Sequence, residues 1–337
     1  MEQSNQATPQ LFFETVNAYQ RSAAIKTAVE LDIFTKIAEG NDNILKIAQA
    51  CNASEKGVRV LCDTLTILGF LHKQNGNYAL TEASTVFLNK HSPAYMGGIT
   101  DFLLSPMLLE GFENLTEAVR KGGTAIKDDG SVSPENPVWV QFARAMMPMM
   151  MPAAQMMASQ LDADSKEALK ILDIAAGHGI FGITLAQRFQ NAEVYAVDWA
   201  NVLEVAQENA EKFGVANRFH KIAGSAFEAD FGGNYDVVLL TNFLHHFDPS
   251  TCETLLRKIN AAMNENGKVL TLEFVPNDDR VSPPTEAMFS LVMLASTPKG
   301  DAYTFTELSK MFESAGFSSN EHITLEPLPQ HLIASTK

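Results

Sequence analysis

The sequence predicts an α/β protein in which a mostly parallel sheet follows a mainly helical amino-terminal region. Three observations support this fold class. Short apolar strands alternate with helical segments from residue 169 onward, a hairpin signal lies within the first 100 residues, and 337 residues exceed the size at which one core usually stops growing. We therefore expect domains at 1–100 and 166–337, joined by a mostly helical segment at 101–165.

The amino-terminal region reads as helices that end in a small hairpin. Leu61, Leu65 and Leu68 recur at helical spacing, and two short strands flank Asn75 and Gly76, which form a strong hairpin signal. Helix, turn, helix and hairpin is the order of a winged helix. Such domains often bind DNA, but eight Lys and Arg face nine Asp and Glu here, which favours dimerisation or covering of a substrate over DNA binding.

Seven strand candidates follow the segment 101–165, which is itself interrupted at 121–137 by a loop rich in Gly, Pro and Asp. Five of them alternate with helices, which implies parallel pairing with right-handed crossovers. The last two are closely spaced and imply an antiparallel final strand. The candidates lie at 170–175, 193–199, 218–225, 235–244, 267–275, 320–327 and 331–336.

The composition limits the function classes. Hydrophobic residues make up 46% and charged residues 19%, as expected of a well-packed globular protein. A net charge of −15 repels polyphosphate, so we expect no nucleic-acid partner and a small-molecule substrate instead. The three cysteines are few and far apart, which argues against a disulfide framework or a zinc ribbon and favours a reducing compartment.

No targeting or membrane signal is expected. The first ten residues lack the basic and apolar regions of a signal peptide. The most apolar stretch, 146–158, contains two prolines and a glutamine and is too short to span a bilayer. We therefore expect a cytoplasmic protein with no membrane partner.

The strongest chemical signal is the turn that follows the first strand of the sheet. The segment ILDIAAGHG at 171–179 places Asp173 before the turn and Gly177 and Gly179 within it. These glycines let the backbone come close to a ligand at the start of the next helix. Asp198 ends the second strand, where a carboxylate can accept hydrogen bonds from ribose hydroxyls.

Two cofactors compete for this turn. Residues 177–182 match GxGxxG, and Asp198 follows Gly179 by 19 residues, as in NAD enzymes. Asp173, however, would repel a pyrophosphate and attract the ammonium and sulfonium groups of S-adenosylmethionine (SAM). A glycine turn that binds nothing is the third alternative. The sequence favours SAM as the cofactor.

Nearly the whole chain resembles the O-methyltransferase family that includes plant caffeate-type enzymes and bacterial enzymes of polyketide and hydroxyneurosporene pathways. Residues 173–179 stand where the family has DxGGGxG, and GSAF at 224–227 stands for its GDxF element. The resemblance implies a winged-helix dimerisation domain at 1–100, an acceptor-pocket segment at 101–165 and a Rossmann-like, seven-stranded class I methyltransferase domain at 166–337. It also implies a homodimer.

The resemblance carries over a set of donor-binding residues, with departures. Ala175 and Ala176 replace glycines, and because alanine is strained at positive φ we expect a slightly different loop. Ser225 replaces a carboxylate and offers a weaker hydrogen bond. The implied donor-binding residues are Asp173, Ala175, Gly177, Gly179, Asp198, Trp199, Ser225, Ala226, Phe227, Thr241 and Asn242.

The candidate general base is His245. Methyl transfer from a sulfonium requires positioning and removal of the proton of the nucleophile. The stretch FLHHFDPSTC at 243–252 follows a strand and is similar to the LHDWSDEHC-like stretch of the family, whose catalytic histidine falls on His245. A structural histidine or a metal ligand, with His178 and His246 nearby, are the alternatives. Without HxH or HExxH spacing, we predict no metal.

Two acidic residues are assigned by the same resemblance. Glu273 ends the fifth strand and matches a family glutamate that orients the histidine. The second family glutamate has no counterpart in 300–304, where Asp301 is the substitute. This gap leaves open whether the methylated atom is oxygen.

Flexible methionines and aromatic rings suit an aromatic or polycyclic acceptor, although a methionine-rich helix can equally be core or dimer interface. Seven of the fourteen methionines lie in 146–157. The predicted function is SAM-dependent methylation of a hydroxyl on such an acceptor. The alternatives are C-methylation and a SAM-binding or winged-helix regulatory protein without catalysis. The expected acceptor residues are Trp139, Phe142, Met146, Met150, Met288 and Met293.

Overall fold

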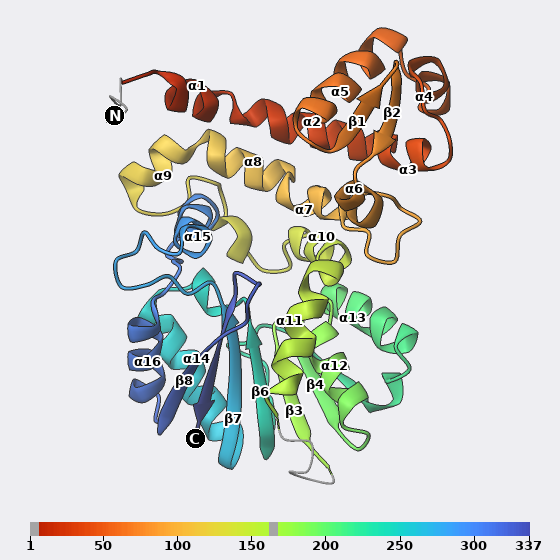
Figure 1. Cartoon of the computed structure of the whole chain (residues 1–337). Helices are drawn as coiled ribbons and strands as arrows, with labels where there is room; N and C mark the ends of the chain where they lie inside the picture. Colours follow the sequence, from red (N-terminus) through yellow and green to blue (C-terminus); the bar gives the residue numbers. More distant parts are fainter. Residues whose placement is uncertain (1–6, 162–167) are drawn as a thin grey trace, which may run out of the picture. The chain divides into compact units, whose positions relative to one another are not determined.

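The computed structural model describes residues 7–161 and 168–337 and is shown in Figure 1. The chain divides into two compact units, Met1–Leu104 and Ser105–Lys337. The division falls close to the expected boundary at residue 100, and most of the helical segment 101–165 belongs to the second unit. Each unit has a hydrophobic core of its own.

The first unit has the expected order of helices followed by a hairpin. Asn75 and Gly76 connect its two strands with φ of 52° and 83°, the positive values that a type I′ turn requires. Its elements are α1 (Gln10–Val16), α2 (Ala18–Glu30), α3 (Ile33–Ala38), α4 (Ile44–Ala50), α5 (Glu55–Ile67), β1 (Leu71–Gln74), β2 (Asn77–Leu80), α6 (Glu82–Phe87), η1 (Gly97–Ile99) and α7 (Thr100–Leu103).

Helix α5 organises the core of the first unit. The Ser54 hydroxyl caps it by accepting a hydrogen bond from the Gly57 N–H at 3.1 Å. Its buried face includes Leu65, at helical spacing from Val58 and Cys62. The hairpin is tied to this helix because the buried Tyr78 donates its hydroxyl proton to Asp63 at 2.7 Å.

The second unit begins with helices and continues into the sheet domain. None of the helices within residues 7–161 and 168–337 is long and apolar enough to cross a membrane. The helical elements are α8 (Pro106–Glu113), α9 (Leu115–Lys121), η2 (Gly130–Val132), α10 (Val138–Ala145), α11 (Met147–Ser159), α12 (Ile180–Arg188), α13 (Ala200–Lys212), η3 (Ala216–Arg218), η4 (Leu244–His246), α14 (Pro249–Ala262), α15 (Pro284–Ser296) and α16 (Phe305–Ser314).

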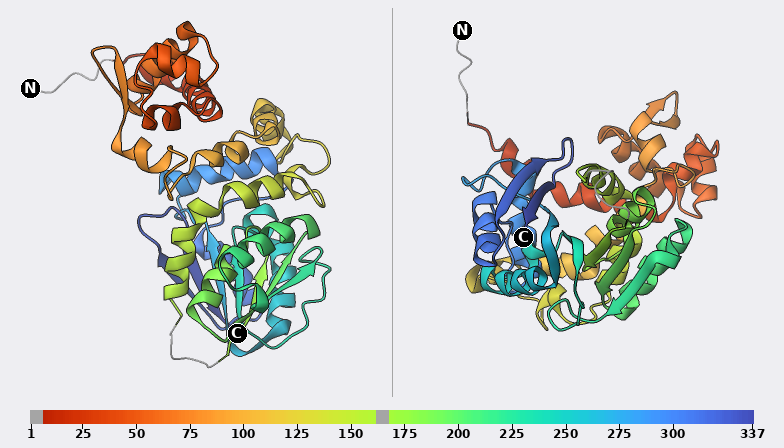
Figure 2. Two further views of the ribbon diagram at one scale, coloured as in Figure 1. Left: turned by 90° about the vertical axis from the view of Figure 1, so that its right-hand side faces the viewer. Right: turned by 90° about the horizontal axis from the view of Figure 1, so that it is seen from below.

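The sheet confirms the predicted α/β class with antiparallel final strands. Its seven strands run in the order β5-β4-β3-β6-β7-β9-β8, parallel except for the pairs that involve β9. Helices α12 and α13 cover one face, and α14 and α16 cover the other (Figure 2). The strands are β3 (Lys170–Ile174), β4 (Glu193–Asp198), β5 (Phe219–Ala223), β6 (Tyr235–Thr241), β7 (Met263–Glu273), β8 (Ser319–Thr324) and β9 (His331–Thr336).

The strand order reverses between β3 and β6, and this reversal positions the site. Both strands are central and covered on both faces, so nearly every residue along them is buried. In sheets of this kind, ligands bind beyond the carboxyl ends of the strands at the reversal. The turn after β3 and the segment after β6 therefore form the candidate site.

The bond between Tyr78 and Asp63 predicts a measurable contribution to the stability of the first unit. We expect Tyr78→Phe to lower the free energy of opening of the hairpin by about 0.5–1.5 kcal/mol, because a partly buried hydrogen bond is lost. Hydrogen exchange of the amides in β1 and β2 measures this energy. Lys73→Met is the control, since its exposed ion pair with the same carboxylate is screened by water and contributes little to stability. Equal losses in the two variants would contradict the prediction.

Candidate active site

The turn after β3 is held in left-handed conformations. Ala175, Gly177 and Gly179 have φ of 53°, 57° and 72°. Ala175 adopts this conformation at a cost of roughly 1–2 kcal/mol, which is the strain expected of alanine at positive φ. Two backbone bonds fix the turn around it, from the Ala176 N–H to the Val197 carbonyl at 3.2 Å and from Gly179 to Ala176 at 2.7 Å.

Asp198 joins this turn to the end of β4. One of its carboxylate oxygens accepts the Gly177 N–H at 2.8 Å, and the other accepts the Trp199 N–H at 2.7 Å. Burial raises the pKa of Asp198 to about 6, while the two hydrogen bonds act in the opposite direction. Each oxygen keeps a second lone pair, so the carboxylate can still accept hydrogen bonds from a ligand.

Asp173 lies fully buried beneath the same turn. Its Oδ2 accepts the Gly182 N–H at 3.1 Å, whereas its Oδ1 has no hydrogen-bond partner among the described residues. Burial is the main reason that the pKa of Asp173 rises to about 7, and the nearby Asp198 raises it further. A positive charge bound near this carboxylate would therefore stabilise its ionised form.

Two more buried polar atoms at this edge lack partners within the described part of the chain, namely His178 Nε2 and Asn242 Oδ1. Burial lowers the pKa of His178 to about 3, so the ring is neutral. Its Nδ1 accepts the Ile180 N–H at 3.2 Å, which places the ring proton on Nε2 as an unused donor. Unpaired buried polar atoms are costly in proteins, and their gathering here indicates the site of a polar ligand.

The segment 224–227 is fixed by a lysine that sequence reasoning missed. Lys258 on α14 donates to the carbonyl oxygens of Ala226 and Phe227 at 3.0 Å each and of Ala229 at 2.7 Å. Within the segment, the Ser225 hydroxyl accepts the Phe227 N–H at 3.2 Å. Helix α14 therefore holds the loop in place. The role of Lys258 follows from these contacts between segments and not from a local sequence pattern.

His245 and Glu273 form a buried dyad at the ends of β6 and β7. The Nδ1 atom of His245 is hydrogen-bonded to Oε2 of Glu273. The other oxygen of Glu273 accepts the N–H groups of Phe243 and Leu244 at 3.0 and 2.8 Å. Because an ionised carboxylate only accepts, the proton of the ring lies on Nδ1 and the lone pair of Nε2 is free to take up a proton.

His246 lies in a different environment from its neighbour. Its Nδ1 donates to the Phe243 carbonyl at 3.1 Å. Burial, with a smaller effect from His245, lowers the pKa of His246 well below its usual 6.5, so the ring is neutral. No group of three potential ligands that could hold a metal ion exists in 7–161 and 168–337, so the three-histidine alternative has no cluster to support it there.

Asp301 contacts His245 only through the backbone. Its N–H donates to the His245 carbonyl at 2.9 Å. Its carboxylate pairs with Arg280 at 3.1 Å and accepts the Ala302 N–H at 2.9 Å. The Asp301 side chain does not contact the ring of His245. The expected role of Asp301 as the second glutamate of the family is therefore not supported by a contact with the base.

Helix α10 brings two of the expected aromatic residues to the site. Trp139 packs edge-on against His246 with ring centroids 5.2 Å apart, and its indole N–H donates to the Ser131 carbonyl at 2.8 Å. Phe142 stacks on His178 at 5.8 Å. The same helix therefore contacts both the turn after β3 and the histidine segment after β6.

The expected methionines divide into two groups. Met146, Met150 and Met293 are buried, whereas Met288 is 67% exposed. On the same helix, Phe289 meets the ring of His245 instead, with centroids 4.9 Å apart. Helical periodicity does not mark the buried face of α15, because apolar residues occur all round this helix and the buried residues include Glu286 and Ser296.

The remaining expected donor-binding residues also lie at the carboxyl edge of the sheet. Thr241 is the last residue of β6, and Trp199 follows β4 as the amino-terminal cap of α13. Trp199 packs on the cluster formed by Ala143, Val202 and Val205, which Trp139 also contacts. The structure thus places the predicted donor residues along one edge of the sheet, at the ends of the four neighbouring strands β3, β4, β5 and β6.

Comparison with known proteins settles the family. A family model described as the O-methyltransferase domain matches residues 130–318, and one described as the O-methyltransferase dimerisation domain matches residues 13–90. The chain belongs to the O-methyltransferase family. The expected resemblance is thereby confirmed, and the dimerisation model favours that interpretation of the first unit over DNA binding.

Individual proteins similar to this O-methyltransferase are also methyltransferases by name. The crystal structure of a provisionally assigned O-methyltransferase from Nostoc punctiforme is 56% identical, covers 99% of this chain and 100% of its own, and superimposes with a TM-score of 0.95. The 3-hydroxy-5-methyl-1-naphthoate 3-O-methyltransferase of Streptomyces sahachiroi is 25% identical over 92% of this chain and 90% of its own. A SAM-dependent methyl transferase of a Serratia strain is 25% identical over 94% and 92%.

These findings confirm the predicted enzyme class and the predicted cofactor, SAM. The alternative of an NAD-binding enzyme is therefore wrong. The O-methyltransferase domain model spans the turn after β3, the dyad and the aromatic residues of α10.

The burial of Asp173 predicts a pH-dependent stability. The folded chain holds the proton of this carboxyl up to about pH 7, whereas the unfolded chain loses it near pH 4. Stability therefore falls as the pH rises from about 4 to about 7, by an amount on the order of 4 kcal/mol at most. We expect Asp173→Asn, which keeps an acceptor for Gly182, to match the wild type at pH 4 and to exceed its stability at pH 8, while binding SAM more weakly.

Chemical unfolding of the ligand-free protein and calorimetric titration with SAM measure the two effects. Asp230→Asn is the matched control, because exposed Asp230 also accepts a glycine N–H, from Gly232 at 2.9 Å. A stability difference at pH 8 no larger than that of the control would contradict the prediction.

Proposed function

We propose that this O-methyltransferase moves the methyl group of SAM to a phenolic hydroxyl of a small aromatic or polycyclic acceptor, with His245 as general base. The observation that carries the proposal is the buried dyad of His245 and Glu273, which lies beside the donor turn and leaves Nε2 free. The names of the curated relatives, which include a naphthoate O-methyltransferase and a tetracenomycin O-methyl transferase, support an aromatic acceptor.

The residues of the turn fit the donor. Asp198 has free lone pairs for ribose hydroxyls, and the unpaired oxygens of Asp173 and Asn242 suit the positively charged end of SAM. The ring of Phe227, in the loop held by Lys258, offers a flat apolar surface for the adenine. When bound, the donor supplies a methyl group on a sulfonium that is already activated as a leaving group.

The dyad supplies the proton chemistry. An acceptor phenol has a pKa near 10, so few molecules are ionised at neutral pH and a base must take the proton as the oxygen attacks. Nε2 of His245 takes that proton, and the ionised carboxylate of Glu273 stabilises the resulting imidazolium. The two backbone N–H groups that donate to Glu273 hold the carboxylate in position.

The apolar surroundings exclude water from the reacting atoms. His245 is 5% exposed, and the ring of Phe289 covers one side of it. Trp139 and Met150 add aromatic and thioether surface at the same edge, through contacts with His246 and Asn242. Such walls suit a flat ring and strengthen the electrostatic contacts within the site.

The general-base proposal predicts a loss of turnover without a loss of donor binding. We expect His245→Gln to lower kcat by a factor of about 10²–10⁴, because the phenol proton has no acceptor. The affinity for SAM, measured by calorimetry, should stay within about threefold, since the ring is not among the groups assigned to the donor. His72→Gln, at an exposed position of the first unit, is the control. Turnover by His245→Gln at the level of this control would overturn the role of base.

We further propose that a second copy of the chain covers helix α1. Leu11, Phe12, Phe13 and Val16 are between 52% and 76% exposed, and no residue of this helix is buried. A row of exposed apolar side chains on one helix is typical of an interaction surface. The dimerisation domain model covers this region from residue 13 onward.

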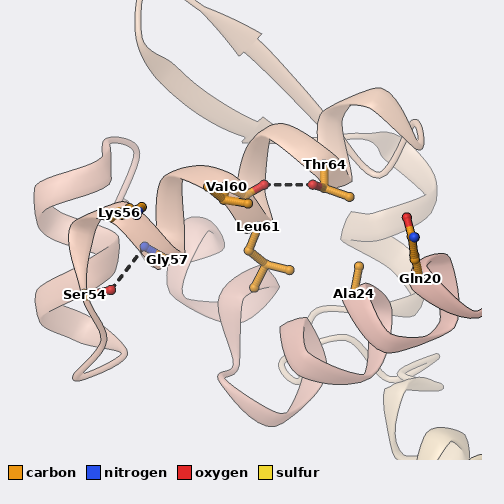
Figure 3. A pocket seen from close by; sticks show the side chains of 8 residues that line it. All are labelled: Gln20, Ala24, Ser54, Lys56, Gly57, Val60, Leu61 and Thr64. Carbon is orange, nitrogen blue, oxygen red and sulfur yellow. Dashed lines mark hydrogen bonds between the residues drawn. The ribbon is translucent and has the colours of Figure 1, made fainter.

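A hollow in the same unit extends the candidate interface. It has a volume of about 530 Å³ and lies between α2 and α5 (Figure 3). Ala24, Val60 and Leu61 give it an apolar lining, while Gln20 and Thr64 lie at its edge with polar groups. An apolar side chain of a partner could fill this hollow.

The interface predicts that charges on α1 dissociate the dimer. We expect the double variant Phe12→Glu, Phe13→Glu to sediment as a monomer at concentrations where the wild type sediments as a dimer, because burying two carboxylates is costly. The control is Val281→Glu, at a 71% exposed apolar position of the second unit. A dimer that persists in the double variant would contradict the assignment of α1.

A further inference from the structure

A buried carboxylate, to which the described residues donate no hydrogen bond, lies on the helix that also carries Phe289. Glu286, in the first turn of α15, is 7% exposed. Within 7–161 and 168–337 the ionisable group paired with it at less than 4 Å is His331, whose Nε2 lies 3.7 Å from the carboxylate, which is longer than a hydrogen bond. Carboxylates are rarely this buried unless they are paired, so Glu286 needs an explanation.

The face of α15 places Glu286 near the reacting groups. Phe289 and Met293 follow it at the spacing of one helical face, and Met293 is buried. Phe289 is the residue that meets the ring of His245. One helical turn, about 5 Å along the axis, separates Glu286 from Phe289. The carboxylate therefore lies one helical turn from the residue that contacts the ring of the base.

Strand β9 approaches the same place from the sheet. His331 pairs in register with Glu273, the carboxylate that holds His245. The preceding residue, Gln330, is buried and donates to the sulfur of Met150 at 3.8 Å. The neighbours of Glu286 thus belong to the residues around the dyad rather than to a separate surface.

The histidine next to Glu286 is neutral and turned toward it. Nε2 of His322 and Nδ1 of His331 lie 2.6 Å apart and share one proton. Burial lowers the pKa of both rings. If His322 supplies the shared proton, His331 presents an N–H to the carboxylate, whereas the opposite arrangement would set a lone pair against a negative charge. The first arrangement is favoured, and it leaves the charge of Glu286 uncompensated by any cation.

We propose that Glu286 binds a positively charged nitrogen of the acceptor, so that the acceptor of this enzyme carries an amine as well as a hydroxyl. The inference rests on the proposed function, because it concerns the acceptor of the same site. An uncharged N–H donor would satisfy one lone pair of the carboxylate but leave its negative charge uncompensated. A cationic nitrogen both donates a hydrogen bond and neutralises the charge. The net charge of −15 also attracts cations over longer distances.

The same carboxylate disfavours acidic acceptors. The Streptomyces sahachiroi relative is named for a hydroxynaphthoate, which is an anion at neutral pH. Glu286 would repel such a group in a site from which water is excluded. The inferred acceptor therefore differs in charge from that of this relative, although both carry an aromatic hydroxyl.

A series of three 2-naphthols with aminomethyl, ethyl or carboxyl groups at carbon 6 tests the inference by calorimetric binding to enzyme saturated with S-adenosylhomocysteine. At pH 7.5 we expect the amine to bind at least tenfold more tightly than the ethyl compound, and the carboxylate most weakly. Glu286→Gln should weaken binding of the amine tenfold or more and change binding of the ethyl compound less than threefold. Glu286→Asp, which keeps the charge, should preserve the order of the three affinities.

Glu321→Gln, which removes an exposed carboxylate of β8, is the control and should leave all three affinities unchanged. Circular dichroism and the affinity for S-adenosylhomocysteine verify that each variant is folded. No measurable binding of the amine, binding of the ethyl or carboxyl compound as tight as that of the amine, or an unchanged order in Glu286→Gln would overturn the inference.

Binding is measured without turnover, so the proposed function is tested separately. His245→Gln should bind the three naphthols in the same order as the wild type while failing to methylate the amine. If the wild type binds the three naphthols in the expected order of affinity but does not methylate the amine, the proposed reaction is refuted and the inference about Glu286 is retained.

Discussion

The carboxylate of Glu273 is the group on which the site depends. It ends β7, accepts two backbone N–H groups from the segment after β6, and holds Nδ1 of His245. One side chain therefore fixes the path of the loop, the orientation of the ring and the position of its proton. Gly300 completes this arrangement, because a Cβ atom there would lie 2.2 Å from the His245 carbonyl. The proposed base is thus supported from two neighbouring segments.

Two residues of the donor turn lower the stability of the fold. Ala175 has a strained backbone conformation, and the carboxylate of Asp173 is buried. Both lie where the strand order of the sheet reverses. A segment optimised for stability alone would carry glycine and an apolar residue at these positions. The unpaired polar atoms around the turn are consistent with a fold that completes its hydrogen bonds only when a polar ligand is present.

The sequence was sufficient for features that depend on local patterns. Strand and helix periodicity predicted all seven strands, and Asn75 with Gly76 predicted the hairpin turn. Motif resemblance led to His245 and Glu273, whose contact the structure then showed. The sequence did not indicate that Phe289 contacts His245 or that Glu286 lies beside His331. Glu286 and His331 are 45 positions apart and meet only through the packing of α15 on the sheet. The sequence indicated strain at Ala175 but not its left-handed conformation, which the backbone bonds of the neighbouring Ala176 accompany.

Asp173 has a consequence for the end of the catalytic cycle. Once the sulfur has passed on its methyl group it is uncharged, and the buried carboxylate beneath the turn loses the attraction that offsets its burial. A group whose pKa in the empty fold is about 7 then regains a proton readily near neutral pH. We therefore expect the turn to hold the spent donor, which keeps its ammonium group but has lost the charge on sulfur, less firmly than the fresh one.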